Sequence, residues 1–211
     1  MNLIFDFFLE AYSKASLPQI LLEAITFVFG IISVLYAKKE NIWVYPTGLI
    51  ATIISVYLLY TAGYYGDMMM NFYYSAMSIF GWYNWSRVSR GSRVVLISRT
   101  TGKEKALGIL LCILTMIVTY TIYQFFGTEI LIENYIDILT SGMFFTAMWY
   151  MATKKIENWT LWIIADLITV PLYAYRGLGM LSLQYLIFTF LAIQGYRQWN
   201  QKIKMTSPKI A

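Results

Sequence analysis

The chain has 211 residues, of which 59% are apolar, 18% are aromatic and 13% are charged, with a formal net charge of +5. Soluble domains carry about 25% charged residues, so this composition excludes an ordinary soluble enzyme and indicates a surface that faces lipid. The sequence has no histidine and one cysteine. It therefore excludes histidine-based metal sites, Ser-His-Asp chemistry and an internal disulfide, and we expect neither a metal nor a cofactor.

Seven apolar segments follow one another along the chain, each close to the roughly 20 residues that a helix needs to cross a bilayer. Short loops join most of them. The sequence therefore predicts an all-α, multi-pass membrane protein. The predicted helices are 18–37, 43–62, 68–85, 106–126, 135–152, 159–175 and 179–196.

Basic residues predict the orientation of these helices. Of the 16 Lys and Arg residues, all but Lys14 and Arg176 fall in the first, third and fifth loops or in the C-terminal tail. Because cytoplasmic loops are enriched in Lys and Arg, we expect the N-terminus outside and the C-terminus inside. This split requires an odd number of crossings, and it explains the basic charge without a nucleic-acid partner.

Two blocks of sequence recur in the same order. Lys-Lys-Glu-Asn-Ile-Trp at 38–43 matches Lys-Lys-Ile-Glu-Asn-Trp at 154–159 with an offset of 116, and Gly-Trp-Tyr-Asn-Trp at 81–85 matches Gly-Tyr-Arg-Gln-Trp at 195–199 with an offset of 114. Helices one to three thus repeat as five to seven, and the fourth connects them. Repeat members lie four helices apart, so both triplets enter the membrane in the same direction, as in the SWEET sugar carriers. The alternative is a chance recurrence of interfacial aromatics.

This repeat divides the chain into five parts. They are an extracytoplasmic segment (1–17), a first three-helix repeat (18–90), a basic cytoplasmic loop with the connector helix (91–127), a second three-helix repeat (128–199) and a cytoplasmic tail (200–211).

Two carboxylates fall inside predicted spans. A charge at the bilayer centre costs at least about 2.5–3.5 kcal/mol, so each needs a reason to be there. For Asp166, seven residues into the sixth helix, we favour a cavity-facing role over a structural hydrogen bond to a neighbouring helix. For Glu23, five residues into the first helix, both readings are open.

Aromatic and amide side chains complete the candidate site. Trp159, Trp162, Asp166 and Tyr173 share one helical face, and such a stripe suits a flat or cationic ring through stacking and cation–π attraction. Trp159 equally suits the interfacial belt. Asn71 and Gln184 lie at similar depths in the third and seventh helices; their amides suit a substrate amide or hydroxyl, or helix association.

Several blocks carry a family resemblance that runs from about Glu23 to Trp199. They are Glu-Asn-Ile-Trp at 40–43, Gly-Asp-Met at 66–68, Tyr73-Tyr74 with Gly-Trp-Tyr-Asn-Trp at 81–85, and Glu-Asn-Trp-Thr-Leu-Trp at 157–162 with Asp166. In order and spacing they resemble the Pnu family of bacterial vitamin transporters, most closely its PnuC branch. The resemblance implies an inner-membrane homotrimer with a 3+1+3 helix plan. It also implies import of nicotinamide riboside by facilitated diffusion, with cytoplasmic phosphorylation trapping the substrate.

Nicotinamide riboside carries a positive pyridinium, an amide and ribose hydroxyls, which an aromatic cage, a carboxylate and side-chain amides would match. The expected substrate-binding residues are Trp162, Asp166, Gln184, Asn71, Trp159, Tyr173, Tyr74 and Glu23. Thiamine, carried by the PnuT branch, is also a flat cation with a hydroxyl and stays open as an alternative. So does a polytopic membrane protein without transport activity. The sequence has no ATPase motif, and we do not expect an enzyme.

Overall fold

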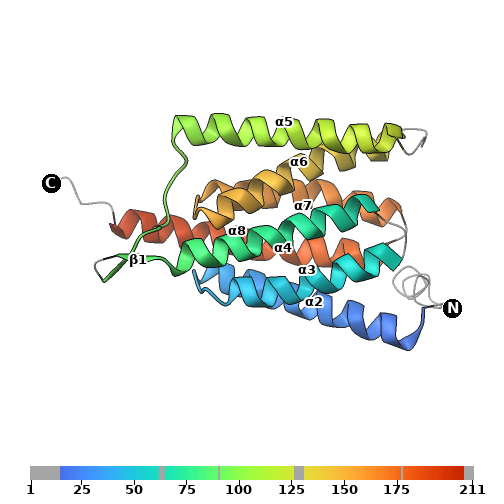
Figure 1. Cartoon of the computed structure of the whole chain (residues 1–211), viewed down its shortest axis with the longest axis horizontal. Helices are drawn as coiled ribbons and strands as arrows, with labels where there is room; N and C mark the ends of the chain where they lie inside the picture. Colours follow the sequence, from blue (N-terminus) through green and yellow to red (C-terminus); the bar gives the residue numbers. More distant parts are fainter. Residues whose placement is uncertain (1–14, 62–64, 90, 126–130, 177, 207–211) are drawn as a thin grey trace.

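The computed structural model describes residues 15–61, 65–89, 91–125, 131–176 and 178–206. Within these ranges the chain forms seven α-helices and one short antiparallel hairpin, shown in Figure 1. They are α2 (Leu17–Lys38), α3 (Val44–Thr61), α4 (Tyr65–Ser86), β1 (Val88–Ser89), β2 (Ser92–Arg93), α5 (Gly102–Phe125), α6 (Ile132–Ala152), α7 (Glu157–Tyr175) and α8 (Gly179–Thr206).

The seven predicted helices are confirmed in number and order, with changes at their ends. Four of them, α2, α3, α5 and α8, are long and apolar enough to cross a membrane. The last helix was predicted to end at Tyr196 but continues to Thr206. Its 28 residues span about 42 Å at 1.5 Å per residue, more than the roughly 30 Å of a hydrocarbon core. The polar last turns therefore extend beyond the length that a bilayer requires.

Consecutive helices pack side by side in two triplets, α2–α3–α4 and α6–α7–α8. Two contacts join the triplets: α2 packs on α8, and α4 packs on α6. The connector α5 packs on α6 at the outside of the bundle, as Figure 1 shows. The start of α2 and the end of α8 lie at opposite ends of the bundle.

The densest packing lies at the end of the bundle that holds the α2–α3 loop, the hairpin and the α6–α7 loop, which we call the hairpin end. Trp85 and Trp199 are buried there, near the ends of α4 and α8. The indole of Trp85 donates to the carbonyl of Met151 at 3.2 Å, and that of Trp199 donates to the carbonyl of Ala37 at 3.2 Å. Each triplet thus caps the last turn of the other triplet's first helix.

The two loops at this end have the same backbone structure with an offset of 114. Glu40 has φ of 58° and Lys154 has φ of 54°. The amides of the next residues, Asn41 and Lys155, each donate to a carbonyl five residues earlier. The predicted offset of 116 for this block is therefore wrong by two residues. Matching identical letters aligned the lysine pairs, whereas the backbone aligns the residues that end each helix.

Glycines let the third helix of each triplet approach the second at matching positions, Gly81 and Gly195. A Cβ at Gly81 would meet the ring of Tyr45, and a Cβ at Gly195 would lie 2.7 Å from the ring of Trp159. Because these rings are buried and cannot move freely, only glycine fits.

Gly195→Ala is expected to lower the free energy of unfolding by about 1–3 kcal/mol, since the added methyl group overpacks the core. Thermal unfolding of the detergent-solubilised protein measures this change. Gly102→Ala is the matched control, because a Cβ there meets nothing within 4 Å. Equal midpoints for the two variants would contradict the close approach at Gly195.

Candidate functional site

Five aromatic rings from four helices form a continuous central aromatic cluster: Tyr74 on α4, Phe144 on α6, Trp162 and Tyr173 on α7, and Tyr185 on α8. The Trp162 ring lies 6.3 Å from that of Tyr74 and 5.3 Å from that of Phe144. Tyr185 stacks on Phe144 at 5.9 Å and on Tyr173 at 5.3 Å. The cluster thus brings together three of the predicted site residues, Trp162, Tyr173 and Tyr74.

Asp166 lies on α7 between two members of this cluster, one helical turn from Trp162 and two turns from Tyr173. Its side chain is 1% exposed. Neither carboxylate oxygen has a hydrogen-bond partner among the described residues. Because burying an unpaired charge is costly, this position requires a partner that the described chain does not supply, such as a cation, a proton or a ligand donor.

The equivalent position in the first triplet is satisfied within the protein. The offset of 114 places Thr52 opposite Asp166, and the hydroxyl of Thr52 accepts a hydrogen bond from Ser75 at 2.8 Å. The residue opposite Ser75 is Thr189, which donates instead to the carbonyl of Tyr185 on its own helix at 2.9 Å. The second triplet therefore carries Asp166, whose carboxylate has no hydrogen-bond partner among the described residues, where the first triplet has two hydroxyl groups bonded to each other.

The two predicted amides lie in different triplets, Asn71 in the first and Gln184 in the second. Gln184 is partly buried on α8 and faces α2, where its Nε2 lies 3.6 Å from the position of a Cβ at Gly30. The ring of Phe188 faces the same glycine at 3.4 Å. Asn71 is partly buried on α4, and the offset of 114 places it opposite Tyr185 of the aromatic cluster.

Trp159 and Glu23 lie away from the aromatic cluster. Trp159 is buried at the hairpin end, where its ring meets that of Trp199 edge-on at 5.5 Å. Glu23 is exposed near the start of α2. The face of α7 that carries Trp159, Trp162, Asp166 and Tyr173 therefore begins in the core of the hairpin end, at Trp159, and continues into the aromatic cluster. Substrate contact by either residue stays a prediction.

Phe144 and Tyr185 are cluster residues that the sequence analysis did not select. Tyr185 had a usable signal, because it is the repeat partner of Asn71. Phe144 had none, since α6 carries two adjacent phenylalanines and only the fold separates their roles. Phe145 stacks instead on Tyr73 at 3.6 Å, and the hydroxyl of Tyr73 donates to the Phe145 carbonyl at 3.0 Å.

The ion pairs of the described residues lie at the two ends of the bundle rather than in the cluster. At the end opposite the hairpin, Arg176 donates to Asp137 at 2.7 Å. At the hairpin end, a cavity of about 310 Å³ is lined by Lys39, Glu40, Asn41, Ile42, Arg93 and Lys202. Within the described ranges, no three His, Cys, Asp or Glu side chains gather into a metal site.

Known proteins match nearly the whole chain. A family model described as nicotinamide mononucleotide transporter matches residues 20–201. The nicotinamide riboside transporter PnuC of Escherichia coli (strain K12) is 27% identical over 201 residues, covering 84% of each chain. The riboflavin/roseoflavin transporter RibM of Streptomyces davaonensis is 22% identical over 182 residues, covering 82% of this chain and 81% of RibM.

A crystal structure of the vitamin B3 transporter PnuC has the same fold. It is 24% identical, covers 90% of this chain and 85% of that chain, and superposes with a TM-score of 0.72. The predicted family and the predicted membrane location are thereby confirmed. This chain is a multi-pass protein of the bacterial inner membrane and belongs to the nicotinamide mononucleotide transporter family.

Proposed function

We propose that this protein imports nicotinamide riboside by facilitated diffusion and that phosphorylation in the cytoplasm traps the substrate. The observation that carries the proposal is Asp166 beside the central aromatic cluster: its carboxylate is buried and has no hydrogen-bond partner in the part of the chain that the structure describes. The curated PnuC relatives from Escherichia coli and Neisseria mucosa, the latter 25% identical over 206 residues (90% of this chain, 76% of the relative), are named for the same substrate.

Each part of the riboside has a counterpart in the chain. The pyridinium ring is flat and positive, so Trp162 and Tyr185 offer π faces and Asp166 offers an opposite charge. The carboxamide and the ribose hydroxyls both donate and accept hydrogen bonds, as the amides of Gln184 and Asn71 do. Tyr74, Phe144 and Tyr173 exclude water from the ring. In this proposal Trp159 supports the site from the core rather than touching the substrate.

The same chemistry favours the riboside over its phosphorylated form. A phosphate monoester carries about −1.5 to −2 charges at neutral pH and requires Arg, Lys or backbone donors. The aromatic cluster offers none of these cations, and Asp166 would repel the phosphate. Arg176, on the same helix, is already paired with Asp137 at the end of the bundle.

The proposal includes a 3+1+3 arrangement of parallel triplets with the predicted division of the chain. Its support is the pairwise exchange of contacts, α2 with α8 and α6 with α4, and the offset of 114 that relates both loops and both Gly–aromatic contacts. This exchange is what a pseudo-two-fold axis along the membrane normal produces. The proposal also includes the homotrimer that the family resemblance implies, in which three copies of this chain contact one another.

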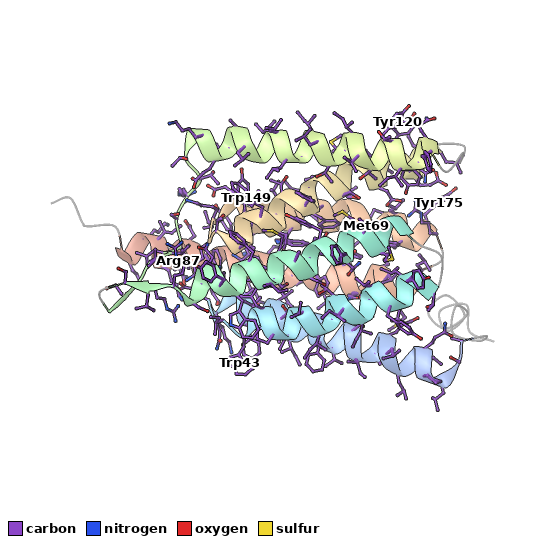
Figure 2. All side chains as sticks on the ribbon, in the orientation of Figure 1. Trp43, Met69, Arg87, Tyr120, Trp149 and Tyr175 are labelled. Atoms are coloured by element: carbon purple, nitrogen blue, oxygen red, sulfur yellow. The ribbon has the colours of Figure 1, made fainter. Side chains whose placement is uncertain are left out.

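The proposed orientation places the hairpin end in the cytoplasm. Basic side chains gather at that end, whereas Arg176 lies at the other. Exposed aromatics mark both interfaces: Figure 2 shows Trp43 pointing outward near the hairpin end, and Tyr120 and Tyr175 at the opposite end. The basic residues at the hairpin end are Lys38, Lys39, Arg87, Arg93, Arg99, Lys103, Lys105, Lys154, Lys155, Arg197, Lys202 and Lys204.

Calorimetric titration of the purified protein in detergent tests the substrate. Nicotinamide riboside is expected to bind at least about tenfold more tightly than nicotinamide mononucleotide, because each 1.4 kcal/mol of charge repulsion gives that factor. Thiamine is titrated in parallel. Preference for thiamine would move the protein to the other vitamin substrate, and binding of none of the three would contradict the proposed function.

A further inference from the structure

A buried ion pair joins the two triplets at the hairpin end. The Nζ of Lys154 lies 2.7 Å from Oε1 of Glu40, and the Lys154 side chain is completely buried. The ammonium also sits 4.7 Å from the centre of the Trp85 ring. Burial lowers the pKa of Lys154, and Glu40 opposes that shift only in part. The Lys154 ammonium is therefore held in surroundings where its charge depends on Glu40.

Both members of the pair occupy the same structural position in their own triplets. Each is the residue with positive φ in the loop between the first and second helix, and the offset of 114 relates them. The bond therefore crosses the boundary between the triplets at equivalent points of the two loops. It lies beside other bonds that join the triplets at this end, from Trp85 to Met151 and from Trp199 to Ala37.

Glu40 has a second set of partners on the outer side. Its Oε2 accepts a hydrogen bond from Lys202 on α8 at 2.8 Å, and Arg93 of the hairpin lies 3.5 Å from Oε1. Burial raises the pKa of Glu40, but the hydrogen bonds from Lys154 and Lys202 outweigh it and keep the pKa low. When Lys154 moves away, Glu40 thus keeps cationic partners, which lowers the cost of separating the pair.

A buried core lies next to the pair at the hairpin end. Ala37, Trp85, Met148, Met151 and Trp199 belong to it. A substrate held by the central aromatic cluster is therefore blocked on the hairpin side by this core and by the ion pair that crosses it.

We propose that Glu40 and Lys154 form a latch that keeps the hairpin end closed, and that substrate leaves on this side only when the pair separates. A buried ion pair suits this role because its desolvation penalty offsets most of its attraction, so it fixes a geometry without large net stability. The proposal rests on the transport function proposed above. Its test measures only how accessible a reporter cysteine is in the absence of substrate, so a failure of the latch can be distinguished from a failure of the proposed substrate.

The experiment places a reporter cysteine behind the latch. Met148→Cys is made in a Cys112→Ser background, which removes the chain's single cysteine. Inside-out vesicles are treated with a membrane-impermeant maleimide, without substrate. Glu40→Gln and Lys154→Gln are each expected to raise the labelling rate at least about tenfold, because each removes the bond between the two loops, and Glu40→Gln also leaves the buried Lys154 ammonium without its carboxylate.

Three controls separate a latch from a damaged fold. Asp137→Asn breaks the 2.7 Å pair with Arg176 at the opposite end and is expected to leave labelling unchanged. A second reporter, Ile138→Cys, is buried toward that end. In right-side-out vesicles treated with the same maleimide it is expected to stay protected in the latch variants, whereas general unfolding would expose both cysteines. Lys202→Gln removes only an exposed partner of Glu40, so it folds readily and is expected to raise labelling about twofold to fivefold.

Unchanged labelling in folded Glu40→Gln and Lys154→Gln would overturn the latch. So would exposure of both reporters together. If riboside binding fails while the latch variants behave as expected, the proposed substrate is wrong and the latch stands.

Discussion

Asp166→Asn is expected to weaken nicotinamide riboside binding by roughly 30-fold or more. Removing one partner of a buried charge pair costs about 2 kcal/mol at the lower end, and 1.4 kcal/mol is a tenfold change in Kd. Asn has nearly the same shape as Asp, so packing around α7 is kept. Calorimetry on the purified variant measures the change.

A neutral ligand shows whether Asp166→Asn weakens binding through the lost charge or through a change in the shape of the site. The reduced form of the riboside has an uncharged ring and the same ribose and amide. Its affinity is expected to change less than about threefold in Asp166→Asn, because no charge pair is lost. Equal losses for both ligands would show that Asp166 holds the site's structure rather than the pyridinium charge.

Trp162→Ala is expected to weaken riboside binding by about 10-fold to 100-fold. Stacking of a ring on an aromatic side chain contributes roughly 1–3 kcal/mol when measured by alanine substitution. Trp162 contacts both Tyr74 and Phe144, so its loss also loosens the rings around it. Titration of the variant with the riboside gives the change directly.

Two further variants test whether this effect belongs to the cluster. Trp162→Phe keeps a π face and is expected to recover most of the affinity. Trp43→Ala removes a tryptophan that is 59% exposed outside the bundle, and it is expected to leave Kd unchanged. A similar loss in Trp43→Ala would mean that the effect comes from general destabilisation in the membrane.

The helices could be predicted from the sequence because lipid imposes a simple rule on it. Backbone groups in a bilayer must be paired internally, so each apolar segment of sufficient length becomes a helix. The rule is weaker outside the hydrocarbon core. The last turns of α8, from Arg197 to Thr206, are helical although they are polar overall, because Trp199 is buried in the core and Lys202 binds Glu40 of the α2–α3 loop.

The repeat was visible in the sequence with the right offset at Gly81 and Gly195, but its register in the loop after the first helix was not. The offset of 114 is set by hydrogen bonds at helix ends, and these do not depend on which side chains stand there. Glu40 and Lys154 are structural equivalents with opposite charges, so no alignment of similar letters would pair them. The ion pair between them therefore became visible only in the fold.

The candidate site shows the same limit. Trp162, Asp166 and Tyr173 share a face of one helix, which the 3.6-residue period predicts. Phe144 and Tyr185 come from other helices, and in a chain with 18% aromatic residues composition does not separate them from lipid-facing rings. Trp159 lies on the predicted face of α7 but at the hairpin end, where that face meets Trp199 instead of the cluster.

Uptake of labelled nicotinamide riboside into proteoliposomes, with the membrane potential clamped at zero, tests the central claim most directly. Facilitated diffusion predicts entry above the level of protein-free liposomes until the internal and external concentrations are equal. An imposed pH gradient is expected to leave that end point unchanged. Accumulation above the external concentration driven by the pH gradient would show coupled transport, and uptake no faster than in protein-free liposomes would contradict the transport of this substrate.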